Sequence, residues 1–263
     1  MREESQSAPA VDESSVMMPE HAMAVQKLYE SCRATFTRNA GSFPAQGLQR
    51  VRSILDSIKP SDVGLDENAP IQQNSRTNLL GRINGRRGKV SPAISYLHLY
   101  ECNYFSMGIF CLPKSAVIPL HNHPGMTVMS KLLYGSMHVK AYDWVDHNDV
   151  SHPRLAKLVV DRTLTAPCES SILYPKSGGN MHVFTAITPC AVLDVLAPPY
   201  SAEDGRHCTY FRALPYASRT GRSLTEEQRK ELSLHDLVWL EESRPPDDFV
   251  VTPAPYTGPT IIP

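Results

Sequence analysis

Ile-Pro-Leu-His-Asn-His-Pro-Gly-Met-Thr-Val, residues 118–128, sets two histidines two positions apart in an apolar stretch. Side chains two apart in an extended strand point to the same face, so the imidazoles of His121 and His123 would project together. One metal ion could accept both. The pair is a weak signal by itself, because two histidines can share a strand face by chance.

A third histidine adds to this signal. His182 follows a glycine turn in Gly-Gly-Asn-Met-His-Val-Phe, residues 178–184. In a barrel of antiparallel strands, its imidazole can complete a facial set of three ligands with His121 and His123. Zinc and iron(II) both accept such a set, and the sequence does not choose between them. Other histidines lack paired spacing and are expected to be structural or exposed, namely His98, His138, His147, His152, His207 and His235.

The sequence around these segments predicts an all-β core. From Ile94 to Phe211 the chain consists of short runs of β-branched and aromatic residues, broken by turn residues and without helical periodicity, which is typical of an antiparallel sandwich or barrel. The expected strands are Ile94–Glu101, Tyr104–Leu112, Val128–Leu133, Met137–Trp144, Lys157–Arg162, Ser171–Tyr174, Val183–Ile187 and Ala191–Leu196.

The flanking segments differ from this core. Residues 1–18 are expected to form a disordered tail, and residues 19–263 a single domain. Apolar residues at helical spacing predict two N-terminal helices that pack outside the barrel, from about Pro19 to Asn39 and from Pro44 to Pro60. A segment near 226–240 is expected to be amphipathic or partly helical, and the proline-rich residues 244–263 to run as an extended strap.

Composition narrows the function classes. The chain has 263 residues, with 26 Lys and Arg against 27 Asp and Glu, so no overall basic field attracts nucleic acid. The N-terminal residues contain no apolar run of the length that a signal peptide or membrane span needs, so we expect neither secretion nor a membrane anchor. Six cysteines without Cys-x-x-Cys spacing are expected to be reduced thiols.

Several blocks together resemble one enzyme family. The two histidine segments are similar to the two halves of the cupin motif, with Val128 where most cupins carry a glutamate ligand. More specifically, the sequence resembles the plant cysteine oxidases, relatives of the animal cysteamine dioxygenases. The blocks that carry this resemblance are Ser95–Glu101, Gly108–Pro113, Ile118–Val128, Lys131–Met137, Gly179–His182 and Asp194–Tyr200.

The resemblance implies a double-stranded β-helix of the cupin or jelly-roll type that binds one Fe(2+) per chain and uses O2 as co-substrate. It implies oxidation of the N-terminal cysteine of proteins to cysteine sulfinic acid, which marks them for the arginine branch of the N-degron pathway in oxygen sensing during hypoxia. Ethylene-response transcription factors are the implied substrates, and nucleus and cytoplasm the implied location. A monomer that contacts neither nucleic acid nor membrane is expected.

The resemblance also assigns residues. It places the iron ligands at His121, His123 and His182, all of which are present, and an aspartate needed near the active site at Asp194. It links Tyr200 and Cys208 to activity as well. Each of these three has a structural alternative: a buried acid bonded to a neighbouring strand for Asp194, turn packing for Tyr200 and a core thiol for Cys208.

Two other functions compete with this interpretation. One is oxidation of small thiols such as cysteamine or free cysteine, although no arginine stands in the metal segments to bind the carboxylate of free cysteine. The other is a metal-binding cupin that turns over no substrate. Three neutral imidazoles without a carboxylate would leave the charge of a divalent metal to exogenous ligands, which favours an enzyme that binds a thiolate and O2.

Overall fold

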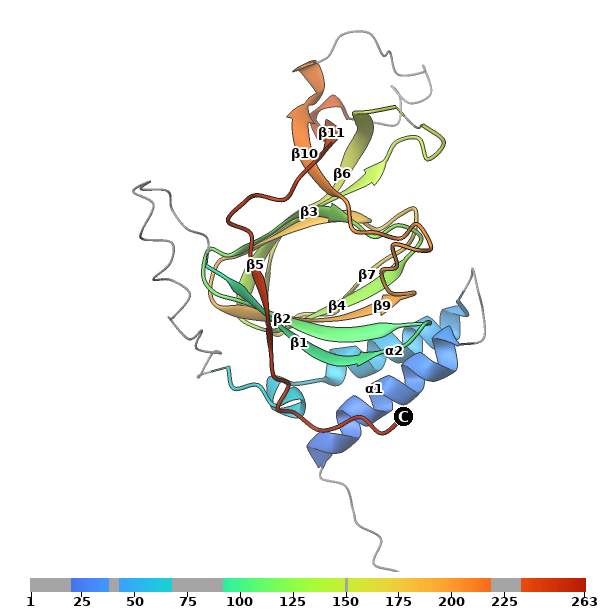
Figure 1. Cartoon of the computed structure of the whole chain (residues 1–263), viewed down its shortest axis with the longest axis vertical. Coiled ribbons are helices and arrows are strands. Elements are labelled where there is room, and N and C mark those ends of the chain that lie inside the picture. The colour runs from blue at the N-terminus through green and yellow to red at the C-terminus, as the bar shows by residue number, and fades with distance from the viewer. Residues whose placement is uncertain (1–19, 38–42, 68–91, 150, 219–232) are drawn as a thin grey trace, which may run out of the picture.

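The computed structural model describes residues 20–37, 43–67, 92–149, 151–218 and 233–263. The tail expected at residues 1–18 lies outside these ranges. Two six-stranded sheets stack on each other, and two helices cover the outer side of one sheet (Figure 1). The expected all-β core with N-terminal helices outside it is confirmed. Among the described residues, no helix is both long enough and apolar enough to span a bilayer.

The first sheet has the strand order β12-β1-β2-β9-β4-β7, and only the β12–β1 pair is parallel. In that order its strands are Val251–Ala254, Ile94–Glu101, Ser106–Leu112, Cys190–Ala197, Thr127–Tyr134 and Ser171–Leu173. The second sheet has the order β10-β11-β6-β5-β8-β3, and β10 pairs back onto β3, so this sheet closes as a barrel. Its strands are Tyr210–Pro215, Leu237–Ser243, Arg154–Thr165, Ser136–Trp144, Met181–Ala186 and Val117–Asn122.

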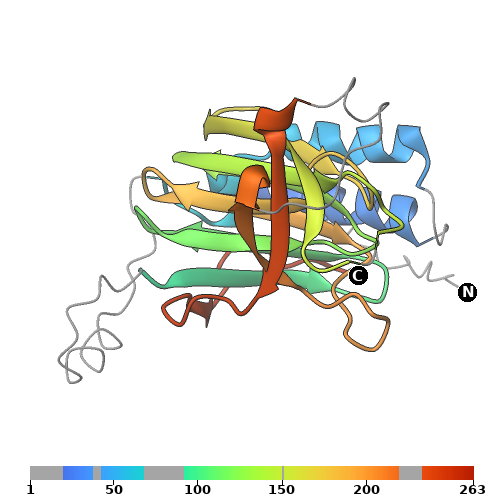
Figure 2. The same cartoon turned by 90° about the horizontal axis from the view of Figure 1, so that it is seen from above.

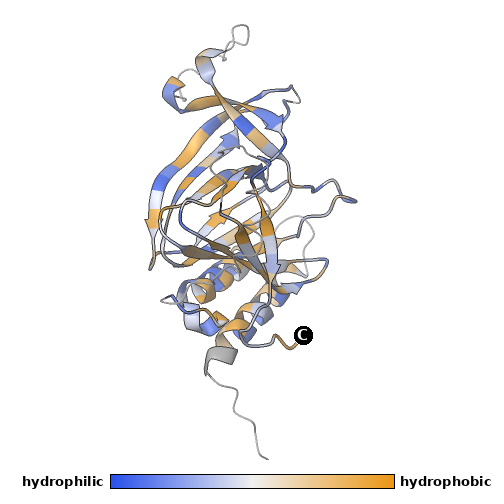
Figure 3. Ribbon diagram, turned by 60° about the vertical axis from the view of Figure 1, so that its left-hand side comes forward, coloured by the Kyte–Doolittle hydropathy of each residue, from blue (hydrophilic) through white to orange (hydrophobic). Residues whose placement is uncertain are grey.

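The first sheet separates two apolar clusters, and the side chains of strand β9 contribute to both. Successive side chains on a strand point to opposite faces. Leu193 and Val195 belong to the apolar cluster beneath the helices, whereas Val192 packs with residues of both sheets in the barrel interior. Asp194, between Leu193 and Val195, therefore points into the barrel. Figure 3 shows hydrophobic and hydrophilic residues interleaved along the strands.

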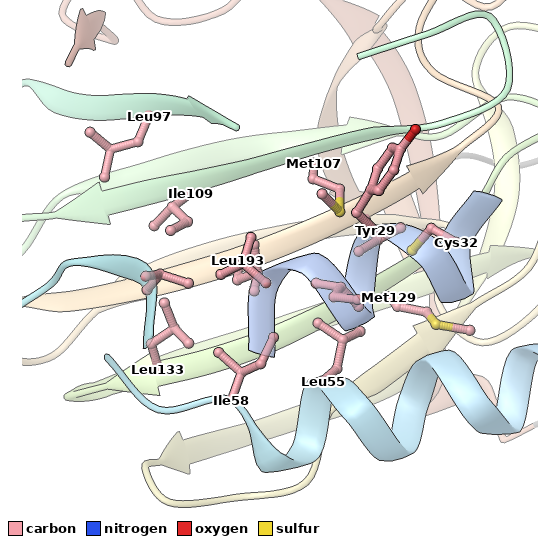
Figure 4. Close-up of a cluster of buried hydrophobic side chains, with 14 of the residues drawn as sticks. Tyr29, Cys32, Leu55, Ile58, Leu97, Met107, Ile109, Met129, Leu133 and Leu193 are labelled. Carbon is pink, nitrogen blue, oxygen red and sulfur yellow. The ribbon is translucent and has the colours of Figure 1, made fainter. Parts of the chain in front are cut away.

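The helices α1 (Glu20–Phe36) and α2 (Ala45–Ser57) exist because each has one apolar stripe that the first sheet buries. In Figure 4, Leu55 of α2 lies below Leu193 of β9, and Tyr29 of α1 lies beside Met107 of β2 in the same buried cluster. Pro44 precedes α2 and Pro60 follows it in the short helix η1 (Pro60–Val63), as is typical of proline at helix boundaries. Seen from above, both helices lie on the same side of the sheets (Figure 2).

The structure corrects the boundaries at the C-terminal end. Of the segment near 226–240 that was expected to be amphipathic or partly helical, the described residues 233–240 form the single helical turn η4 (Leu234–Asp236) and then enter strand β11, which was not expected. Pairing with β6 and β10 decides this, because it buries Trp239 and Leu240. The sequence analysis also missed β10 and β12, and described β3 only as extended chain.

The C-terminal residues do form the expected strap. After the one-turn helix η3 (Tyr216–Ser218) and β11, the chain runs back across the molecule to pair β12 with β1. Further on, the backbone of Ile262 both donates to and accepts from the side-chain amide of Gln26 on α1, at 3.0 and 2.9 Å. The strap therefore ties the first helix to the first sheet.

The helices are integral to the domain, so truncating their buried face should destabilise the whole fold. Leu55→Ala removes a fully buried side chain and should lower the free energy of unfolding by about 2 to 5 kcal/mol. Gln49→Ala, at an exposed position of the same helix, is the control and should leave it nearly unchanged. Urea unfolding followed by circular dichroism measures both; equal effects of the two variants would contradict the packing described.

Candidate metal centre

The histidines come from two neighbouring, hydrogen-bonded strands of the second sheet. His121 on β3 pairs directly with His182 on β8, and His123 follows one residue after β3 ends. The ring centroids are 4.8 Å apart for His121 and His123, 4.8 Å for His121 and His182, and 4.5 Å for His123 and His182. One ligand atom from each ring lies within 4.8 Å of the other two, and no carboxylate or thiol joins this group within the described residues.

Hydrogen bonds leave a ring nitrogen free on two of the three histidines. Nδ1 of His121 lies 2.8 Å from the carbonyl oxygen of Pro119, and Nδ1 of His123 lies 2.8 Å from that of Asn180. Since a carbonyl only accepts, each Nδ1 donates, and Nε2 is left with its lone pair for a metal. The ring of His182 stacks on Phe184 with the centroids 4.2 Å apart.

Burial keeps the three imidazoles neutral. It lowers the pKa of His121 to about 4 and that of His123 to about 3, where the neighbouring His121 acts in the same direction. The pKa of His182 is also lowered, well below its usual range, chiefly by burial. Neutral imidazole is the form that binds a metal, so the three residues fit a divalent cation without a competing proton.

A buried polar network holds two of the ligands in place. The side chain of Asn180 accepts from the backbone N–H of His123 at 3.2 Å and donates to the carbonyls of His123 and Tyr174, each at 2.9 Å. The buried carboxylate of Asp143 on β5 accepts from the N–H groups of Gly179 and Asn180 at 3.0 and 2.9 Å. It therefore stabilises the turn that delivers His182 to the site.

Asp194 lies inside the barrel with one oxygen unsatisfied. Its neighbours in the sheet register are Ser130 on β4 and Gly108 on β2. Burial raises the pKa of Asp194 to about 7, against the opposing effect of a hydrogen bond from Ser130. Oδ1 is buried and has no hydrogen-bond partner among the described residues. A carboxyl oxygen left unpaired in the interior is costly to the fold.

Tyr200 lies beside His123, and Cys208 contacts Tyr200. The Tyr200 hydroxyl donates to the carbonyl oxygen of Asn122 at 2.8 Å, and its ring centroid lies 5.9 Å from that of His123. Burial raises the pKa of Tyr200 well above its usual range, with Cys208 acting in the same direction. Burial also raises the pKa of Cys208, against hydrogen bonds with Tyr200 and Tyr210. Cys208 is therefore a partly buried thiol between two tyrosines.

Val128 provides no metal ligand. It is buried in a small apolar cluster with Met126 and Leu173, and Tyr200 packs against this cluster. Its strand neighbours point outward, so Val128 shares the inner face of β4 with Ser130. The position at which the cupin resemblance leads one to expect a glutamate is thus apolar and buried.

Sequence reasoning missed four residues around this centre: Asp143, Asn180, Ser130 and Tyr96. Asn180 had a detectable signal, because it stands in the glycine turn directly before His182. Tyr96 on β1 had none: its ring lies over Gly108, where a Cβ would come within 2.3 Å of the Tyr96 hydroxyl oxygen. Burial and the charges of Glu101 and Asp194 raise the pKa of Tyr96 to about 12, which places it near Asp194.

The fold and the histidine group together define a class. A β barrel with helices outside it and three inward-pointing, neutral histidines on two paired strands is a cupin-type protein with a mononuclear metal site.

Comparison with known proteins identifies the family within this class. The PCO_ADO family model matches residues 54–261. Plant cysteine oxidase 1 of Arabidopsis thaliana is 50% identical over 248 residues, which cover 90% of this chain and 80% of that protein. The 2-aminoethanethiol dioxygenase of Mus musculus is 30% identical over 275 residues, 94% of this chain and 100% of that protein. The chain belongs to the PCO_ADO family. Both the plant and the mouse relative carry the names of thiol-oxidising enzymes.

The network around Asn180 should govern metal affinity. Asn180→Ala removes the side chain that clamps His123 and should weaken metal binding about 10- to 100-fold, the usual effect of losing a residue that orients a ligand. Asn148→Ala, at an exposed position, should not weaken it. Competition with a chromophoric chelator measures both affinities, and unchanged affinity in Asn180→Ala would contradict the clamp.

The unpaired carboxyl of Asp194 should make stability depend on pH in the metal-free protein. Its pKa is higher in the folded state than the usual value of 3.8, so this group's contribution to stability is lost as pH rises from about 4 to about 7. Asp194→Asn removes the burial of charge. We expect the variant to be more stable than the parent at pH 8, by up to about 4 kcal/mol, and equally stable near pH 4. Chemical unfolding at both pH values checks this; a variant less stable at pH 8 would contradict it.

Proposed function

We propose that this chain is an iron(II) dioxygenase that converts the N-terminal cysteine of proteins into cysteine sulfinic acid. The observation that carries the proposal is the set of three converging neutral histidines without a carboxylate, in a chain of the PCO_ADO family. His121, His123 and His182 would hold the metal through Nε2 or, for His182, a ring nitrogen. Iron(II), when bound, supplies the redox chemistry that zinc lacks.

The neutral ligand set suits an anionic donor. Three imidazoles bring no negative charge, so the charge of the cation is available to the thiolate of the substrate. The apolar position of Val128 supports the same role, because a glutamate there would compete with the thiolate. Burial of the rings excludes bulk water from the reacting atoms.

Asp194 is assigned to the substrate's α-amine. Its Oδ1 lacks a partner among the described residues, so an N–H of the substrate's neutral amine could satisfy it. With a pKa raised to about 7, the same carboxyl can hold the proton that the thiol gives up. Tyr200 and Cys208 would shape the site next to His123, Tyr200 by fixing the backbone there through its bond to Asn122.

The reaction balances without an external reductant. A thiol and one O2 give one sulfinic acid: both oxygen atoms form bonds to sulfur, sulfur loses four electrons and O2 accepts them. The chain's own residues therefore need to bind, orient and exclude water, and no second cofactor is required.

Two alternatives remain distinct from this proposal. Oxidation of 2-aminoethanethiol is favoured by the similarity to the Mus musculus enzyme of that name, at 30% identity against 50% for the plant cysteine oxidase. Free cysteine is disfavoured, because Arg206, beside the turn at Gly125, is already bonded to Asp204 and to the carbonyl of Pro199. A metal-binding cupin without turnover would leave Oδ1 of Asp194 unexplained.

The proposed partners follow from the substrate class. Proteins that expose an N-terminal cysteine, such as ethylene-response transcription factors, would be marked for the arginine branch of the N-degron pathway when O2 is present. The enzyme would then act as an oxygen sensor in the nucleus and cytoplasm, where such proteins occur.

A free N-terminal cysteine should be the preferred substrate. Thiolate and amine from one residue can form a five-membered chelate, and the rest of the peptide adds remote binding energy. Mass spectrometry should find a gain of two oxygen atoms on a Cys-initiated peptide, both labelled when heavy O2 is used. An acetylated peptide and an internal cysteine should react little. Equal oxidation of the acetylated control would refute the amine requirement, and a preference for 2-aminoethanethiol would favour the first alternative.

Asp194→Asn should separate catalysis from folding. The change keeps shape and removes the charge that holds the amine, so turnover should fall by about 100-fold or more while iron content and folding persist. Iron analysis, circular dichroism and peptide kinetics on one preparation measure all three. Retained turnover would show that Asp194 is only structural.

A further inference from the structure

The inner face of the first sheet carries a row of polar positions across four strands. In the sheet register, Asp194 on β9 has Ser130 of β4 on one side and Gly108 of β2 on the other, and Gly108 also pairs with His98 of β1. Ser130 hydrogen-bonds to the Asp194 carboxyl. Because Gly108 has no side chain, the position next to Asp194 on β2 is open to a group from the following strand.

Tyr96 of β1 fills this position. It shares one face of β1 with Ile94, which packs inside the barrel, whereas Leu97 packs beneath the helices. A Cβ on Gly108 would lie 2.3 Å from the Tyr96 hydroxyl oxygen and 2.6 Å from Cζ. The phenol head therefore stands where a side chain of residue 108 would begin. In an antiparallel pair that point lies about 5 Å from the Cβ of the residue opposite, here Asp194.

The ring of Tyr96 is held in place by its neighbours. Phe110 lies directly across from it on β2, with the ring centroids 4.9 Å apart, and the centroid of His98 lies 6.4 Å away. A hydroxyl on a ring that packing already fixes loses little entropy when it binds a ligand.

Tyr96 and Asp194 lie close to the histidine group. Burial, with the charges of Glu101 and Asp194 added, raises the pKa of Tyr96 to about 12. Burial and Cys208 raise the pKa of Tyr200, and Asp194 acts on it as well; the ring of Tyr200 lies 5.9 Å from that of His123. Since Oδ1 of Asp194 has no partner among the described residues, the Tyr96 hydroxyl does not bond to it directly. A bridging donor between the two would satisfy both oxygens.

The α-amine of an N-terminal cysteine has the chemistry of such a bridge. A neutral primary amine whose lone pair is directed to a metal keeps two N–H groups, and each needs an acceptor where bulk water is excluded. Oδ1 of Asp194 can accept one of them. A phenol oxygen has two lone pairs and can accept the other while its own O–H remains free to donate.

We propose that the Tyr96 hydroxyl, seated over Gly108, accepts the second N–H of the substrate's α-amine and forms the amine pocket together with Asp194. The inference rests on the proposed function, which defines the substrate. It extends the site to β1, a strand that carries no histidine of the metal group. It also gives Gly108 a role, because any side chain there would displace the hydroxyl.

Two variants remove the hydroxyl from the pocket in different ways. Tyr96→Phe keeps the ring and deletes the oxygen. Gly108→Ala keeps the oxygen but places a Cβ 2.3 Å from it, so the ring must move; it is the second variant in case the first folds poorly. Tyr104→Phe makes the same chemical change at a tyrosine that is 51% exposed between β1 and β2, and is the matched control.

Two peptides show whether the amine is recognised. One begins with cysteine, and the other carries 3-mercaptopropionyl in its place, which keeps the thiol and lacks the amine. Anaerobic calorimetry on the iron-loaded protein gives the Kd of each. Tyr96→Phe and Gly108→Ala should weaken binding of the cysteine peptide about tenfold and leave the other peptide unchanged. Oxidation under air should show the same loss in kcat/KM at unchanged iron content. The double variant should lose no more than either single one, because both remove the same bond.

The outcomes separate the amine pocket from the function on which it rests. Tyr96→Phe that keeps the parent's preference for the amine would overturn the pocket. Equal weakening of both peptides would assign Tyr96 to packing alone, and an equal effect of Tyr104→Phe would also overturn the proposal. If the parent prefers the amine, loses that preference in Tyr96→Phe and yet oxidises neither peptide, the pocket stands and the dioxygenase function fails.

Discussion

The register of β3 against β8 is the constraint on which the site depends. Pairing His121 with His182 brings two rings together, and the two-residue spacing brings His123 to the same side. A slip of one residue would turn the histidines of one strand to the opposite face and abolish the group. The turn before β8 secures this register, because Asp143 binds its backbone and Asn180 binds His123. The same few hydrogen bonds therefore fix the strand register and orient the histidines.

Burial gives the centre its chemical character at a cost in stability. It keeps the histidines neutral and ready for a cation, and it raises the pKa of Asp194 to about 7. An unpaired buried carboxyl destabilises a fold, and the apolar clusters on both sides of the first sheet offset this. The helices take part in this compensation, since they cover the sheet that carries Asp194.

Sequence patterns predicted those features of the structure that depend on residues close together in the chain. The spacing of His121 and His123, the glycine turn before His182 and the alternating strands could be recognised because strand geometry has a fixed period. Strand β11 was missed because its apolar run, Leu237 to Leu240, is equally compatible with a helix, and only pairing with β6 and β10 decides its form. Asp143 and Tyr96 could not be found, since their partners are distant in sequence and single polar residues in strands carry no pattern.

The central claim is that three neutral histidines hold one metal whose open positions accept a substrate thiolate. Titrating the cobalt(II)-substituted protein with a Cys-initiated peptide under anaerobic conditions tests it most directly, with absorption followed in the near ultraviolet. The account predicts one cobalt per chain and a sulfur-to-cobalt charge-transfer band that rises with peptide and is absent in His182→Ala. A fully loaded site that shows no such band at saturating peptide would contradict it.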